Sequence, residues 1–401
     1  MNGIVECIHE SSKISLLLST SSRASLFTLA SMFTMRLEEH PLPTSRDDVD
    51  KLIDWLVATL GLVRRRSDEH ADGDKMQPAV RLLREHLLAR PKEGIDAASL
   101  ADEMGLTAAS LHHHISRLAN CRILSSISEG DGWRRHFLRA GSISAAVELL
   151  AIEATAVMKL RMATLERWWV RPEDPSLDVE LESADRELPF RLWISEPRPL
   201  PPVEGVTELS LWMADLGLLG DRPKPQMAGD SLAPRLMQLL LQRGPPLSLD
   251  EAAVELGGAK ARIGRILERF RSAGLVERVA RTDRLATNLW TAMMTQYKRR
   301  GEDWVLLKGG FNRIIPERQI ESLTEALSKG KLTPEIVEKE LSKVAPAEQM
   351  LLLNLLGGRL PLGHRMVGKN AISNSAKVMS RLDRVLRRMK RVAELLDKAM
   401  E

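Results

Sequence analysis

The stretch Leu100-Ala-Asp-Glu-Met-Gly-Leu-Thr-Ala-Ala-Ser-Leu-His-His-His-Ile-Ser-Arg-Leu118 decides the fold of this chain. It predicts two short helices joined by a tight turn, because Gly105 tolerates positive φ and Ala101 is small enough for two helices to touch. A diverged version of the stretch returns 152 positions later. The chain therefore holds two related helix-turn-helix units, whose matching packing positions are Ala101 and Ala253, Gly105 and Gly257, Leu111 and Ile263, Ile115 and Leu267, and Leu118 and Phe270.

The first unit is predicted to cover residues 76–140. A helix over 76–89 has its apolar side chains on one face, and helices capped by Asp96 and Thr107 follow it. Two short apolar runs flank a Gly-containing turn at 129–132, which predicts a β-hairpin. Three helices followed by a hairpin is the order of a winged helix.

The second unit is predicted to cover residues 231–300. Ala233-Pro-Arg-Leu-Met matches Ala79-Val-Arg-Leu-Leu at an offset of 154, and Ser248-Leu-Asp-Glu251 fits a capping box. The wing of this unit is expected to turn near residues 281–284.

Three further segments surround the units. Residues 1–75 are predicted to be helical, with amphipathic runs over 24–37 and 45–61. Residues 141–230 begin with a long helix over 142–170 that is apolar almost all round and continue as an acidic, Pro-rich connector to which we assign no fold. A helix of this kind must be covered by its own chain or by a second copy.

Residues 301–401 are predicted to be helical and to end in a dimerisation helix. Its apolar residues follow a heptad pattern, which favours a coiled-coil-like seam. The heptad residues are Val378, Leu382, Val385, Met389, Val392, Leu396 and Ala399. The whole sequence thus predicts a mainly α protein with tandem winged helix-turn-helix domains, short β-hairpin wings, helical connectors and a C-terminal coiled-coil-like helix.

The bulk composition agrees with several helical domains. A chain of 401 residues predicts two to four domains, and a 44% hydrophobic fraction suffices for ordinary cores. Residues 231–300 hold 13 Lys and Arg against 6 Asp and Glu, which is +7, while residues 76–140 are only +2. The second unit therefore carries the stronger electrostatic footprint for an anionic partner.

Cysteine usage and the N-terminal region point to the cytoplasm. Cys7 and Cys121 are too few for a disulfide framework or a four-thiolate zinc site. The apolar stretch 14–35 is interrupted by Arg23 and by many Ser and Thr residues, which makes it a poor signal peptide and a poor membrane span. We expect a soluble cytoplasmic protein without a cofactor, and the sequence does not indicate which small-molecule effector, if any, it binds.

Residues 100–118, followed by the expected wing from Leu124 onward, resemble the winged-helix transcription regulators of the ArsR type. In that family the recognition helix commonly carries an aliphatic residue, a small polar residue, two histidines and another aliphatic residue. Leu111-His-His-His-Ile115 follows this pattern with His112 at the small polar position. The resemblance implies a winged-helix fold, double-stranded DNA as the ligand and a dimer. It does not extend to metal sensing, because Asp102-Glu-Met104 stand where those sensors often carry a Cys pair.

Helices 108–120 and 259–273 are predicted to enter major grooves, with their apolar stripes turned inward. The wings are predicted to place further arginines near phosphates. A homodimer formed through 142–170 or the terminal heptad would give the DNA site two-fold symmetry. The predicted DNA-binding residues are Thr107, Ser110, His112, His113, Ser116, Arg117, Arg134, Arg135, Lys260, Arg262, Arg265, Arg269, Arg281 and Arg284.

Other interpretations of these features stay open. Winged helices also serve as non-catalytic protein-interaction or chromosome-architectural modules, which would cover the outer arginines with protein, for example against Glu173 and Asp174. The basic run 381–391 is either a solvated helix face or a second DNA-tracking patch. The three consecutive histidines point 100° apart and cannot close on one metal ion. No catalytic motif is present, so we expect no enzyme.

Overall fold

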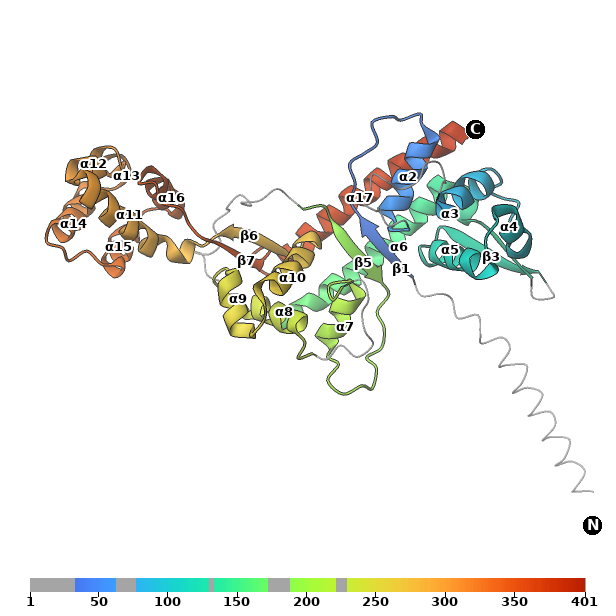
Figure 1. The fold of residues 1–401 in the computed structure, drawn as a ribbon, viewed down its shortest axis with the longest axis horizontal. Coiled ribbons are helices and arrows are strands. Elements are labelled where there is room, and N and C mark those ends of the chain that lie inside the picture. The colour runs from blue at the N-terminus through green and yellow to red at the C-terminus, as the bar shows by residue number, and fades with distance from the viewer. Residues whose placement is uncertain (1–32, 63–76, 130–132, 172–187, 221–228, 401) are drawn as a thin grey trace, which may run out of the picture.

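The computed structural model describes residues 33–62, 77–129, 133–171, 188–220 and 229–400 (Figure 1). Over this part of the chain the protein is mainly helical, with three small antiparallel sheets. No helix in it combines the length and the apolar character that crossing a bilayer requires.

The first unit has the expected order of elements. Its helices are α3 (Pro78–Arg81), which continues as the π-helical η1 (Leu82–Leu88), α4 (Ala97–Met104) and α5 (Ala108–Asn120). Strands β3 (Leu124–Glu129) and β4 (Trp133–Leu138) form the hairpin, and β2 (Ile95–Asp96) adds a third strand in the order β2-β4-β3.

The helix boundaries in this unit follow local signals. Asp96 and Thr107 cap α4 and α5 by accepting hydrogen bonds of 3.2 Å from backbone N–H groups. Gly105 ends α4 in the left-handed conformation, with φ of 62°. Both predicted caps and the predicted turn glycine are confirmed.

The second unit repeats this plan but closes its hairpin differently. It contains α8 (Leu232–Gln242), α9 (Leu249–Leu256), α10 (Lys260–Ser272) and β6 (Val276–Ala280). The strand paired with β6 is β7 (Leu362–Met366), from Val276↔Met366 to Ala280↔Leu362. The prediction of a wing turn at residues 281–284 is wrong, because a short 3-10 turn, η4 (Thr282–Arg284), leads into another helix there.

The segment between β6 and β7 forms a helical lobe, which we call the inserted lobe. It comprises α11 (Leu285–Arg300), α12 (Glu302–Leu307), α13 (Phe311–Ile314), α14 (Glu317–Ser328), α15 (Pro334–Leu341) and α16 (Pro346–Leu355). The lobe has its own hydrophobic core, built on residues such as Leu289, Phe311 and Val337, and it lies at one end of the molecule in Figure 1. The predicted boundary at residue 300 is therefore wrong, since the second unit is completed only after the lobe.

A short strand and a helix precede each unit. They are β1 (Thr34–Glu38) and α2 (Val49–Thr59) before the first, and β5 (Arg191–Ser195) and α7 (Glu208–Asp215) before the second. The predicted helix over 24–37 is wrong at its end, where β1 lies, and residues 24–32 fall outside the described part. The connector without an assigned fold supplies β5 and α7.

These added elements show that the duplication covers most of the chain. Trp55 and Trp212 are counterparts at an offset of 157, and each is followed by a Leu-Gly-Leu turn whose glycine has positive φ. β1 and β5 pair antiparallel, and Arg36 lies opposite Trp193, which the same offset makes its own counterpart. The pairing is therefore symmetric, as a two-fold axis between two copies requires.

Each unit is followed by a long helix, and the two long helices pack against each other. They are α6 (Ile143–Ala163), which continues as the 3-10 turn η3 (Thr164–Trp168), and α17 (Ala371–Met400). They run antiparallel, because the Asp397 carboxylate accepts hydrogen bonds of 3.2 and 3.0 Å from the first two N–H groups of α6. That contact also places a negative charge at a helix N-terminus.

The heptad side chains of α17 are buried within this chain, except for the last, Ala399. Helices α6 and α2 contact α17, as their neighbouring positions in Figure 1 also show. The terminal heptad is therefore buried within this chain and is not exposed to a second copy. On α6, Ile152 and Leu160 stay 57 and 61% exposed, so dimerisation through 142–170 stays a prediction.

Candidate nucleic-acid interface

Helix α10 has a buried apolar side and an exposed cationic side. Its inner face packs Ile263, Ile266, Leu267 and Phe270 into the core. Arg262 and Arg265 are exposed on the outer face. Within the described part of the chain, neither guanidinium has a hydrogen bond or an ion pair with another residue. Both side chains are therefore available to an outside anion.

Two other predicted contacts on α10 are engaged by the protein. Lys260 is exposed but forms an ion pair with Asp250. Arg269 is half-buried, and its Nη1 donates a hydrogen bond of 2.9 Å to the carbonyl oxygen of Leu218.

Helix α5 presents a polar outer face with little charge. Leu111, Ile115 and Leu118 are buried, whereas His112 and His113 are exposed. His112 is within hydrogen-bond distance of Ser116, with 3.2 Å between Nδ1 and Oγ. His113 packs edge-on against His114, with ring centroids 5.7 Å apart. Two further predicted residues, Thr107 and Ser110, form the N-cap hydrogen bond of the helix.

The surroundings of two imidazoles beside this face favour the neutral form over the charged form. Burial lowers the pKa of His114, and the nearby His113 and Arg117 lower it further. Burial also lowers the pKa of His136 on β4, together with Arg134 and His112. This region of the first unit therefore offers hydrogen-bonding groups more than positive charge.

Arg117 and Arg269 occupy equivalent positions in the two units, and both donate hydrogen bonds to backbone carbonyl oxygens. Arg117 donates to the carbonyl oxygens of Leu62 and Gly61, at 2.6 and 2.5 Å, as Arg269 donates to that of Leu218. These oxygens belong to the Leu-Gly-Leu turns that end the preceding helices, where backbone acceptors lack helical partners. We therefore correct the prediction of DNA contacts for both arginines. The repeated Leu-Gly-Leu turn was the sequence signal for their anchoring role.

The wing arginines also divide into two groups. Arg134 and Arg135 are exposed on β4, and their contact with phosphates stays a prediction. Arg281 is buried, with ion pairs of 2.7 Å to Glu251 and 2.6 Å to Asp283. Its prediction as a phosphate contact is wrong, because it neutralises acids inside the second unit. Arg284 is exposed and lies 3.5 Å from Glu251.

Glu251 is the centre of this ion-pair cluster. Burial raises its pKa, but the hydrogen bond from Arg281, the N–H of Ser248 and the charge of Arg243 outweigh burial and lower the pKa to about 2. The predicted capping box is confirmed, because Ser248 and Glu251 each accept a hydrogen bond from the other's backbone N–H.

The basic run 381–391 joins the two halves of the molecule. Arg384 and Arg388 form ion pairs of 3.0 and 2.8 Å with Glu39, and Lys390 pairs with Glu148 at 2.7 Å. The guanidinium of Arg381 donates to two backbone carbonyl oxygens. Much of this charge therefore serves contacts within the chain, a role that neither sequence interpretation anticipated.

The exposure of the outer faces of α5 and α10 helps to decide between a DNA-binding surface and a surface covered by protein. No described residue engages Arg262 or Arg265, while Glu173 and Asp174 lie outside the described part. Comparison with protein-family models, curated proteins and solved structures finds no match for the chain. The resemblance to ArsR-type regulators stays a prediction from the motif.

Proposed function

We propose that this protein is a sequence-specific double-stranded DNA-binding regulator of transcription, built on two winged helix-turn-helix units in one chain. The observation that carries the proposal is the pair Arg262 and Arg265, exposed on the outer face of the second helix of a helix-turn-helix and unengaged by the described residues. Arginine at such a position binds phosphate oxygens or the O6 and N7 atoms of guanine.

The two units contribute differently to binding. Helix α10 supplies positive charge, which gives affinity for any duplex. Helix α5 supplies His113 and Ser110 at the positions that Arg265 and Arg262 occupy in α10, and such polar groups are suited to base edges. Arg134 and Arg135 are exposed on the hairpin of the first unit, where we expect contacts with phosphates.

One chain is sufficient for a two-part DNA site. The symmetric β1–β5 ribbon and the antiparallel pair α6–α17 relate the two units as a dimer interface relates two subunits. Because α5 and α10 present different side chains, we expect an imperfect inverted repeat with two unlike halves, bound by one chain per duplex.

The test is a mobility-shift titration across a salt series. Duplexes are first selected from a random pool with the wild-type chain, and enrichment of a motif is expected for a sequence-specific protein. Arg262→Ala combined with Arg265→Ala should weaken binding by roughly tenfold or more and reduce the log-log salt slope by up to about 2. Arg269 is left unchanged in this variant because its guanidinium is anchored to the carbonyl oxygen of Leu218.

The matched control removes two exposed arginines from the inserted lobe, Arg313→Ala with Arg318→Ala. The control has the same net charge as the test variant and should bind like the wild type. Equal affinity and slope for the test variant and the wild type would contradict the proposed role of α10. A selection that enriches no motif would contradict sequence specificity.

A second candidate function is supported by the inserted lobe. Leu307, Leu351 and Leu355 are 61, 51 and 43% exposed on it. Exposed leucines in a lobe with its own core favour a protein-interaction module. If neither the wild type nor the variants bind any duplex, this interpretation replaces the first.

A further inference from the structure

A groove at the base of the inserted lobe contains two arginines whose guanidinium groups the described part of the chain does not engage. The groove runs along α11 and is closed on its other side by the end of α16 and residues 356–359, with a volume of about 400 Å³. Arg299 and Arg359 line it, and both are exposed. Within the described residues, neither guanidinium has a hydrogen bond or an ion pair. Both are therefore available to an anion from outside.

The charge of these arginines is not offset inside the groove. The described residues that line it include no Asp or Glu. Its polar side chains are neutral and belong to Asn288, Thr291, Thr295 and Gln296. A groove with this lining attracts phosphate oxygens, which bind guanidinium groups through charge-assisted hydrogen bonds.

The turn that carries Arg359 is held against α11. Nδ2 of Asn288 donates a hydrogen bond of 2.9 Å to the carbonyl oxygen of Arg359, and Nε2 of Gln296 donates one of 2.8 Å to that of Leu356. Gly357 has φ of 77°, a left-handed conformation that favours glycine. The backbone that carries Arg359 is thus ordered before a ligand arrives, which lowers the entropy cost of binding.

The groove lies where the second unit would have the turn of its wing. The β6–β7 ladder continues beyond the last strand pair, because the N–H of Arg281 donates a hydrogen bond of 2.9 Å to the carbonyl oxygen of Pro361. Arg359 precedes Pro361 by two positions. Helix α11 leads from this end of the hairpin into the lobe (Figure 1). The groove is therefore next to the second unit and not at the far side of the lobe.

The strands of the two hairpins differ in charge at this end. Because the pairs Leu124↔Leu138 and Val276↔Met366 are equivalent, residues of β4 and β7 correspond at an offset of 228. Leu362 and Gly363 of β7 are then the counterparts of Arg134 and Arg135 of β4. The second hairpin thus lacks the two wing arginines of the first, and Arg359 brings an arginine back to the same end.

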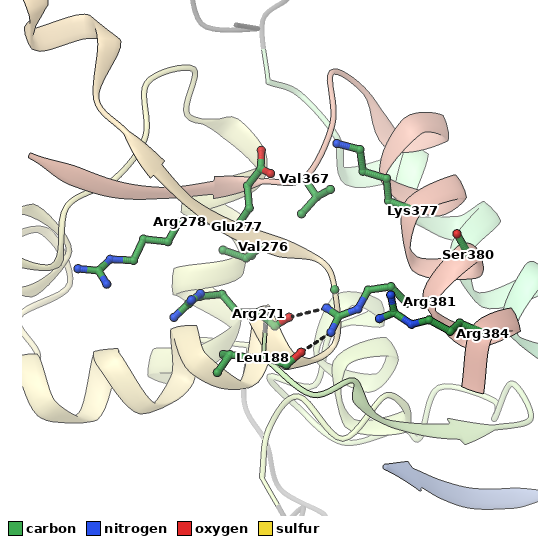
Figure 2. Close-up of a pocket in the computed structure, with 11 residues that line it drawn as sticks. Leu188, Arg271, Val276, Glu277, Arg278, Val367, Lys377, Ser380, Arg381 and Arg384 are labelled. Carbon is green, nitrogen blue, oxygen red and sulfur yellow. Dashed lines mark hydrogen bonds between the residues drawn. The ribbon is translucent and has the colours of Figure 1, made fainter. Parts of the chain in front are cut away.

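The cations at the opposite end of the β6–β7 hairpin are engaged within the chain. Beside α17, the guanidinium of Arg381 donates to the carbonyl oxygens of Leu188 and Arg271 (Figure 2). Arg384 forms an ion pair with Glu39. Those arginines therefore hold parts of the chain together, and the groove of the lobe is the better candidate for an external anion.

We propose that this groove binds the phosphate backbone of the DNA that flanks the half of the site bound by the second unit. The inference rests on the proposed function. From Asn288, which holds Arg359, to Arg299, helix α11 rises about 16 Å. One strand of a duplex presents a phosphate about every 3.4 Å along its axis. The two arginines are therefore placed to bind separate phosphates of a strand, which a single phosphate ion does not supply.

The test is a mobility-shift titration of the full-length protein with two duplexes. Both contain the motif selected with the wild-type chain; the long duplex extends about ten base pairs beyond it on each side, roughly one helical turn, and the short duplex ends at it. Arg299→Ala combined with Arg359→Ala should weaken binding to the long duplex by about five- to tenfold and lower its log-log salt slope by up to about 2. On the short duplex, where the flanking phosphates are missing, this variant should match the wild type.

The matched control is Arg313→Ala with Arg318→Ala, which removes the same charge from exposed positions of the same lobe outside the groove. The control should bind both duplexes like the wild type. Equal weakening by the control and the groove variant overturns the inference. The same is true if the groove variant is weakened to the same extent on both duplexes.

Isothermal titration with pyrophosphate distinguishes a small anion from DNA. Saturable pyrophosphate binding that the groove variant loses, while it keeps wild-type affinity for the long duplex, assigns the groove to a small anion and overturns the inference. If only Arg262→Ala with Arg265→Ala weakens binding to the long duplex, the groove has no role in it and the proposed function stands. Absence of duplex binding by the wild type overturns both.

Discussion

Helices α5 and α10, the second helices of the two helix-turn-helix units, have equivalent structural positions but different side chains on their outer faces. Both have 13 residues, both follow a left-handed glycine, and both are anchored by an arginine to a Leu-Gly-Leu turn. On the outer face, however, Ser110 and His113 correspond to Arg262 and Arg265. The comparison teaches that the packing positions of the duplicated fold are kept, while the positions that face outward have diverged.

The hairpins of the two units differ in a second way. Residues 130–132 separate β3 from β4, whereas the whole inserted lobe separates β6 from β7. The strand order is nevertheless the same, because Leu247 bridges to His364 on β7 as β2 pairs with β4. A hairpin tolerates a long insertion when the inserted chain has a core of its own and its ends lie close together.

The largest difference that can be tested lies at the contacts between the short helix of one half and the long helix of the other half, which are α7 with α6 and α2 with α17. Asp215, the last residue of α7, is buried between Arg161 of α6 and Arg198. The last residue of α2 is the buried Thr59, and Met389 of α17 corresponds to Arg161 at the offset of 228 that aligns the two long helices. Asp215→Ala leaves the charge of Arg161 buried without its carboxylate. We expect a loss of about 3–5 kcal/mol in the free energy of unfolding, measured by urea denaturation.

The double variant Arg161→Met with Asp215→Thr copies the other half of the molecule. Because it removes both charges together, its stability should lie within about 1–2 kcal/mol of the wild type. A double variant as unstable as Asp215→Ala would show that the two halves are not interchangeable at this contact.

Sequence reasoning located the features that depend on neighbouring residues. The caps Asp96, Thr107 and Ser248 and the turn glycines specify helix ends locally, and the structure has them as expected. The pairing of β6 with β7 is set by contacts between distant segments, and no local signal marked it. The helical period of 3.6 residues shows on which face a side chain begins but not where its guanidinium lies. Arg117 and Arg269 were therefore predicted to face outward, although their guanidinium groups bind backbone oxygens.

The second prediction concerns the acid-sensitive cluster around Glu251 in the second unit, which has no equivalent among the described residues of the first unit. Glu251 has Ser99 as its counterpart in the first unit. Its folded-state pKa of about 2 lies below the ordinary value of 4.5, so its contribution to stability is complete above pH 4.5 and is lost as the pH falls toward 2. Glu251→Gln should therefore cost about 1–2 kcal/mol at pH 7, since partial exposure weakens the ion pairs, and nearly nothing at pH 2.

The measurement is urea denaturation of the wild type and Glu251→Gln at several pH values between 7 and 2. Glu255→Gln is the control, because Glu255 pairs with the same Arg243 from a more exposed position and should change stability by less than about 0.5 kcal/mol. A deficit for Glu251→Gln that stays constant down to pH 2 would contradict the assignment of the charge effect.

The smallest expected effect tests the caps of the two outer helices. Thr107 caps α5 with its hydroxyl, whereas its counterpart Ala259 begins α10 without a side-chain hydrogen bond. Ala259 has φ of −64° and ψ of 131°, a conformation in which a serine hydroxyl reaches the N–H of Arg262. Ala259→Ser should therefore stabilise the protein by about 0.5–1 kcal/mol, and Thr107→Ala should destabilise it by about 1 kcal/mol. Opposite shifts in the urea midpoint are expected, and a loss in both variants would mean that position 259 is constrained by something other than the cap.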